Sequence, residues 1–212
     1  MQNKRKGIIF DLDGTLWDSS EEVAIAWSGV LKRHFKLEIS NEEMKSLMGK
    51  TMDDIFRRLL PPSTSNAQAM QIAAECCNAE QEYLRQHGAR LFPHVPEVLE
   101  KLSRTYQLFI VSNCDKGYIE TFLYYYKFEP LFSDTECFGH TGKQKGSSIR
   151  LLLGRNPLQK AVYVGDTHLD MAAAKFAGIP FIHADYGFEK VPEASCSISS
   201  FDELPKAVSE IL

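Results

Sequence analysis

The chain has 212 residues, of which 44% are hydrophobic and 25% charged, and its formal net charge is −4. These values are typical of a soluble globular protein with one domain, or with a core domain and an insertion. The acidic balance argues against nucleic acid and against anionic membrane surfaces as partners. No apolar stretch approaches the roughly 20 residues that a membrane helix requires.

Two further features favour a cytoplasmic protein. The apolar run after the basic cluster Lys4-Arg5-Lys6 covers only residues 8–10 and then turns acidic, which is unlike a signal peptide, and we interpret the cluster as a solvated tail. The cysteines are odd in number and contain no Cys-x-x-Cys pair, which fits a reducing compartment better than a disulfide framework. They are Cys76, Cys77, Cys114, Cys137 and Cys196.

The first predicted element is a short buried strand over residues 8–10 that runs directly into Asp11, Asp13 and Gly14. Because side chains alternate along a strand, Asp11 and Asp13 lie on the same side. Gly14 gives the backbone a way out of the strand. A buried charge must be paired, bound to a metal or reactive, so this pair predicts a cation between the two carboxylates.

The following seventy residues are predicted to be helical, because apolar residues recur there at helical spacing from Val23 and Trp27 onward. Nothing in residues 19–87 has the pattern of a strand. Local signals divide the region: a capping box at Ser40 and Glu43, an acidic start signal at Thr51 and Asp54, a break at Pro61-Pro62, and a helix over 67–86 that Gly88 closes.

From Pro93 onward, predicted strands and helices alternate. We expect helices over 96–104, 118–126, 147–153 and 169–177, and strands over 108–111, 161–164 and 179–182. This alternation predicts an α/β fold, in which helices cover both faces of a parallel sheet.

Polar residues follow the carboxyl ends of these strands, which is where open parallel sheets bind ligands. Ser112 and Asn113 follow the second strand, and Asp166 and Asp170 follow the third. Each group alone would be an ordinary cap or turn. Four acids at one edge would repel one another without a cation, and a site built only from oxygen ligands favours Mg²⁺.

A lysine in the glycine-rich connection over 142–146 would add positive charge to this edge. A site with Mg²⁺, a lysine and a serine hydroxyl suits a phosphoryl group. The connection offers two lysines, Lys143 and Lys145. It is not a nucleotide P-loop, because Gln144 stands where Ser or Thr is required.

Together these residues resemble the four motifs of the haloacid dehalogenase superfamily. Asp11, Asp13, Gly14 and Thr15 match the first motif, Ser112 and Asn113 the second, the loop lysine the third, and Asp166 with Asp170 the fourth. The resemblance implies a doubly wound Rossmann-like core over 1–16 and 89–212, with an inserted all-helical cap domain over 17–88. The cap is similar to that of the phosphoglycolate phosphatase and β-phosphoglucomutase branch.

The resemblance also implies a role for each residue. Asp11 would be the nucleophile that forms an aspartyl-phosphate, and Asp13 the general acid and base. Mg²⁺ would be held by Asp11, the Asp13 backbone carbonyl, Asp166 and Asp170, the last directly or through water. The lysine would offset charge on Asp11 and on phosphate. The resemblance favours Lys145, with Lys143 as the alternative, because Lys145 leads directly into a helix as the family's lysine usually does. The implied substrate- and phosphate-binding residues are Ser112, Asn113, Gly14, Thr15 and, in the cap, Lys50.

The implied activity is that of a phosphatase acting on a small phosphorylated metabolite, in a monomer or homodimer. Asp13 favours phosphate esters over carbon–halogen bonds, because dehalogenases of the family lack this acid. A sugar phosphomutase and a pyrophosphatase are alternatives with the same motifs. A non-catalytic binding protein on this fold is a further alternative, although such a protein would be expected to have lost Asp11, Asp13 or the acids of the fourth motif.

Overall fold

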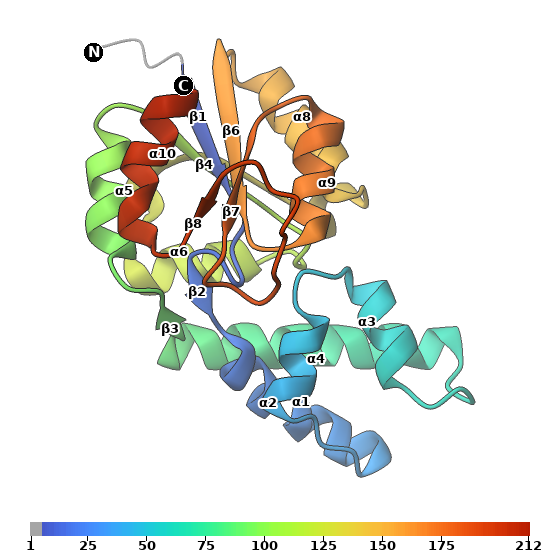
Figure 1. The fold of residues 1–212 in the computed structure, drawn as a ribbon. Helices are drawn as coiled ribbons and strands as arrows, with labels where there is room; N and C mark the ends of the chain where they lie inside the picture. Colours follow the sequence, from blue (N-terminus) through green and yellow to red (C-terminus); the bar gives the residue numbers. More distant parts are fainter. Residues whose placement is uncertain (1–5) are drawn as a thin grey trace.

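A computed structural model describes residues 6–212 and contains a parallel sheet with the strand order β5-β4-β1-β6-β7-β8 (Figure 1). The strands are β1 (Lys6–Phe10), β4 (Gln107–Ser112), β5 (Phe132–Cys137), β6 (Lys160–Gly165), β7 (Phe181–Ala184) and β8 (Ser197–Ile198). β1 lies at the centre, where Ile9 pairs with Phe109 on one side and with Tyr163 on the other. The predicted α/β class is confirmed. Lys4 and Arg5 lie outside the described residues.

Both faces of the central strands are buried, which explains why these strands are short apolar runs. Ile8 and Phe10 belong to one hydrophobic cluster, whereas Ile9 belongs to a second cluster on the opposite face. Helices α5 (Val95–Ser103), α6 (Tyr118–Tyr126) and α10 (Leu204–Ile211) contribute to the first cluster. Helices α8 (Lys145–Arg155) and α9 (His168–Ala177) contribute to the second, on the right of Figure 1.

A group of helices is inserted between β1 and the rest of the sheet, at the bottom of Figure 1. It contains α1 (Ser20–Phe35), α2 (Asn41–Leu47), α3 (Met52–Leu59) and α4 (Asn66–His87). The capping box at Ser40 and Glu43 is present, and Thr51 caps α3. A two-stranded antiparallel ribbon, β2 (Trp17–Asp18) with β3 (Arg90–Leu91), connects the insert to the sheet. The domain limits at residues 17 and 88 stay a prediction.

The structure extends the sequence prediction in the second half of the chain. β5 was not predicted from the sequence, because Asp134 and Glu136 interrupt any apolar pattern there. In the structure both carboxylates pair with Arg155 of α8. β7 begins at Phe181 rather than at residue 179, because Pro180 has no N–H group for the strand ladder. None of the helices in residues 6–212 combines the length and the apolar character that crossing a bilayer demands.

Candidate active site

The carboxyl ends of the central strands bring the predicted acids together in the protein interior. Asp11 follows β1, Asp166 follows β6, and Asp170 lies in the first turn of α9. These three side chains are at most 1% exposed. One oxygen from each can be chosen so that all three atoms lie within 4.8 Å of one another. The sequence pattern thus predicted the residues of this cluster.

Lys145 is the lysine that the structure places in the cluster. As the first residue of α8 it is buried, and its Nζ lies 2.9 Å from Asp11 Oδ2 and 2.6 Å from Asp170 Oδ1. Burial alone would lower the pKa of Lys145, but Asp11 and Asp170 outweigh it and raise that pKa, so the side chain is a fixed cation. Lys143, the other candidate, is exposed.

Asp170 has a second set of contacts that the sequence did not predict. Its Oδ2 accepts hydrogen bonds from the Thr167 hydroxyl at 2.7 Å and from the backbone N–H groups of Thr167 and Asp166 at 3.0 and 3.2 Å. Thr167 and Asp170 therefore form a capping box for α9. The other oxygen of Asp170, Oδ1, accepts a hydrogen bond from Lys145. The Asp170 carboxylate therefore fixes both the lysine and the turn that carries Asp166.

Two carboxylate oxygens in the cluster have no hydrogen-bond partner among residues 6–212, although both are buried: Oδ1 of Asp11 and Oδ1 of Asp166. Burial and neighbouring carboxylates raise the pKa of Asp11 to about 7 and that of Asp166 well above its usual range. A group of buried carboxylates with unsatisfied oxygens fits a hard divalent cation, because such an ion takes oxygen ligands and compensates their charge.

Gly14 is required for this geometry. Its φ is +79°, and a Cβ at this position would lie 2.1 Å from Asp166 Oδ2, an oxygen that accepts the Phe188 N–H at 2.8 Å. The N–H groups of Gly14 and Thr15 donate to Trp17 O and Leu12 O inside the turn. These two amides shape the turn, and phosphate binding by Gly14 and Thr15 stays a prediction.

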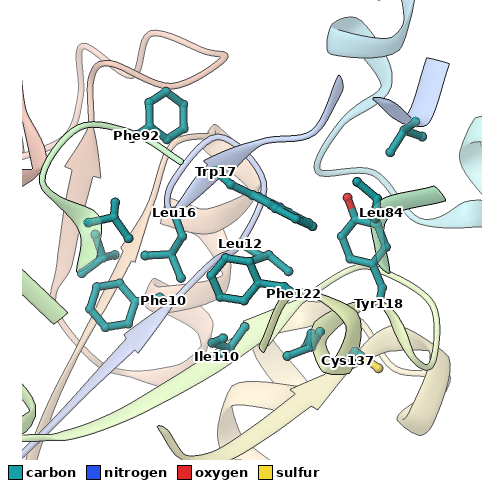
Figure 2. Packing of buried hydrophobic residues seen from close by; sticks show 14 of the residues in the cluster. Phe10, Leu12, Leu16, Trp17, Leu84, Phe92, Ile110, Tyr118, Phe122 and Cys137 are labelled. Carbon is teal, nitrogen blue, oxygen red and sulfur yellow. The ribbon is translucent and has the colours of Figure 1, made fainter. Parts of the chain in front are cut away.

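The Asp13 carboxylate lies apart from the acidic cluster and is held by three donors. Its Oδ1 accepts from the Ser19 hydroxyl at 2.7 Å, the Trp17 indole N–H at 2.8 Å and the Tyr118 hydroxyl at 2.9 Å. Figure 2 shows Trp17 packed beside the rings of Phe122 and Tyr118, with ring centroids 5.0 and 5.7 Å away. Burial raises the pKa of Asp13 although the three hydrogen bonds oppose it.

The remaining predicted residues lie where the helical insert meets the sheet. Ser112 lines the cavity at this boundary, and Asn113 crosses it by donating to Gly49 O at 2.8 Å. Lys50 also lines the cavity, but its Nζ donates to the backbone oxygen of Ser46. Asp11 and Asp13 line it as well. The cavity therefore joins the insert to the acidic cluster.

Comparison with known proteins identifies the family. A model of the family "haloacid dehalogenase-like hydrolase" matches residues 8–184. This range includes all three acids of the cluster, Asp11, Asp166 and Asp170. The chain belongs to this family. It is therefore an enzyme of the hydrolase class, and the resemblance predicted from the four motifs is confirmed.

Known phosphatases and solved structures align with this chain over most of its length. A phosphoglycolate phosphatase of Vibrio parahaemolyticus is 26% identical and covers 100% of this chain and 96% of its own, and one of Aquifex aeolicus is 28% identical with 87% and 86% covered. The crystal structure of a predicted phosphoglycolate phosphatase from Haemophilus somnus aligns with a TM-score of 0.85, 22% identity and 98% and 100% coverage. CbbY from Rhodobacter sphaeroides, solved with phosphate, gives a TM-score of 0.80 at 21% identity, with 93% and 95% covered. These findings agree with the expected enzyme class, a phosphatase of the family.

Proposed function

We propose that this hydrolase is a Mg²⁺-dependent phosphatase that transfers the phosphoryl group of a small monoester to Asp11 and then to water. The observation that supports this most strongly is the state of Asp11. One of its oxygens is held by Lys145 at 2.9 Å, and the other is buried beside Asp166 without a partner. A carboxylate that is oriented and incompletely satisfied in this way is suited to attack a phosphorus atom.

The proposed reaction has two displacements at phosphorus. In the first, an oxygen of Asp11 forms a bond to phosphorus, the bond to the leaving oxygen breaks, and Asp13 gives that oxygen a proton. In the second, Asp13 takes a proton from a water molecule that attacks phosphorus, and the bond to Asp11 breaks. The raised pKa of Asp13 favours the protonated state that the first displacement needs.

Asp11, Asp166, the Asp13 backbone carbonyl and Asp170, the last directly or through water, would hold the cation. Asp170 also holds Lys145. Oxygen donors alone, as found here, are the ligands that Mg²⁺ prefers. When bound, Mg²⁺ would stabilise negative charge on the phosphoryl oxygens. Ser112, which lines the same cavity, would donate a hydrogen bond to one of those oxygens.

The curated relatives are named phosphoglycolate phosphatases. For this chain we propose only the broader substrate class, a small phosphorylated metabolite. The cavity between insert and sheet would hold the leaving group, with Lys50 at its edge. We also propose a cytoplasmic location, which the free cysteines of the chain support.

Replacing Asp166 by Asn tests the cation site. With p-nitrophenyl phosphate as substrate, we expect activity to require Mg²⁺ and to fall by about 10²-fold or more in Asp166→Asn, because a charged ligand is lost. In the wild type, saturating Mg²⁺ should stabilise the fold by about 2.7 kcal/mol at a hundredfold excess over Kd, measured by thermal unfolding. The variant should lose this shift.

Asp53→Asn, which replaces an exposed aspartate of α3, is the control and should behave like the wild type. Phosphate release that is unaffected by EDTA and by Asp166→Asn would contradict the proposal.

Tyr118→Phe tests the acid role of Asp13 through its pH dependence. The Tyr118 hydrogen bond favours the carboxylate and lowers the pKa of Asp13, so its removal should raise that pKa. Because the first displacement needs protonated Asp13, the alkaline limb of kcat/KM for phenyl phosphate should move to higher pH. Tyr126→Phe on the same helix, whose hydroxyl contacts Ala89, is the control. An unchanged or lower alkaline limb in Tyr118→Phe would argue against the assignment.

A further inference from the structure

The cavity above Asp11 and Asp13 contains an acidic residue that the proposed reaction does not use. Its lining from the helical insert is mainly apolar and comprises Val23, Trp27, Met44, Met48, Met52 and Ile55. Glu80 of α4 interrupts this apolar wall. Glu80 is only 4% exposed, and no lysine, arginine or histidine among residues 6–212 pairs with it.

Glu80 is fixed in one orientation. Its Oε2 accepts a hydrogen bond from the indole N–H of Trp27 at 2.6 Å, and the Trp27 ring stacks on Phe56 with centroids 5.0 Å apart. The other oxygen, Oε1, takes no part in this hydrogen bond. A buried carboxyl group is a costly way to satisfy one indole N–H, because the charge must be desolvated.

The position of Asp13 decides which part of a substrate reaches Glu80. Asp13 protonates the leaving oxygen, so the carbon atoms attached to that oxygen extend from Asp13 into the cavity that Glu80 lines. A leaving group in this cavity meets apolar side chains and two further acidic residues, Asp13 and Asp115. Lys50 is the one cation in the described lining, and its Nζ donates to the backbone oxygen of Ser46.

We propose that Glu80 accepts a hydrogen bond from a hydroxyl or ammonium group of the leaving alcohol, and that it thereby selects such phosphate monoesters against esters carrying a carboxylate. This inference rests on the proposed function. A donor would give Oε1 a hydrogen-bond partner, and an ammonium group would also compensate negative charge on Glu80. A carboxylate offers no donor to Oε1 and would face Asp115 and ionised Glu80 with like charge. Glu80 is then a specificity residue of the site and takes no part in the bond changes at phosphorus.

Three phosphate esters of similar size separate these possibilities: 2-aminoethyl phosphate, 2-hydroxyethyl phosphate and 2-phosphoglycolate. With the full-length wild type and Mg²⁺, we expect kcat/KM for each of the first two to exceed that for 2-phosphoglycolate by about tenfold or more. In Glu80→Gln, the preference for 2-aminoethyl phosphate over 2-phosphoglycolate should shrink by about tenfold, because the charge is gone while the amide oxygen can still accept the Trp27 N–H.

Hydrolysis of p-nitrophenyl phosphate, which carries neither kind of donor, should stay close to the wild-type rate in Glu80→Gln. Glu82→Gln on the exposed side of the same helix should change none of the four rates. Equal losses on all substrates in Glu80→Gln would show a purely structural role and overturn the inference.

The wild-type preference decides the inference even if Glu80→Gln does not fold. If the wild type cleaves p-nitrophenyl phosphate without preferring the donor-bearing esters, the inference is wrong and the phosphatase proposal stands. If it cleaves no phosphate ester at all, the proposed function itself fails.

Discussion

Replacing Asp11 by Asn is expected to lower kcat for every phosphate ester by about 10⁴-fold or more. The amide keeps the size of the side chain but cannot form the bond to phosphorus. Asp11 is 1% exposed and its Oδ2 lies 2.9 Å from Lys145 Nζ, so the lysine holds this carboxylate in one orientation. Steady-state phosphate release with Mg²⁺ measures the effect.

The Asp11→Asn variant should remain folded, which separates loss of chemistry from loss of structure. Burial and Asp170 raise the pKa of Asp11 to about 7, so its ionised form is not a major source of stability. Circular dichroism and thermal unfolding should therefore resemble those of the wild type. A folded Asp11→Asn variant that retains more than about a tenth of the wild-type kcat would exclude Asp11 as the nucleophile.

Replacing Lys145 by Met is expected to lower both stability and activity. The ammonium group lies 2.9 Å from Asp11 and 2.6 Å from Asp170, and its removal leaves buried carboxylates without their cation. Breaking a buried pair in this way costs about 3–5 kcal/mol of unfolding free energy, measured by urea denaturation in EDTA. The kcat should fall by about 10²-fold or more, because Asp11 loses its orientation and phosphate loses a compensating charge.

Lys143→Met is the matched control, because it removes an exposed lysine two residues earlier. We expect its unfolding free energy to stay within about 0.5 kcal/mol of the wild type. If Lys143→Met instead lost activity while Lys145→Met kept it, the assignment of the site lysine would be wrong.

The acidic cluster could be predicted from the sequence because each of its parts is encoded locally. A buried strand that ends in Asp11 and Asp13 needs only a few neighbouring residues to be recognised, as does Asp166 after the third predicted strand. Parallel pairing then brings these ends together without further information. Lys145 was favoured over Lys143 through the family resemblance, because it leads directly into a helix as the family's lysine usually does.

The surroundings of Asp13 and the wall of the cavity could not be predicted, because they depend on contacts between distant segments. Tyr118 is 105 residues from Asp13 and gave no signal beyond an apolar helix face. Trp17 was interpreted as a packing residue, and it does pack, but its N–H also donates to Asp13. Glu80 lies within a correctly predicted helix, yet only the approach of Trp27, 53 residues earlier, places it in the cavity.

The central claim, transfer of the phosphoryl group through Asp11, is tested most directly by the stereochemistry at phosphorus. The wild type would hydrolyse an ester made chiral with oxygen isotopes, in isotopically labelled water, and the configuration of the released phosphate would be determined. Attack by Asp11 followed by attack of water inverts phosphorus twice, so the account predicts overall retention of configuration. Inversion would show a single direct attack by water and would contradict the account.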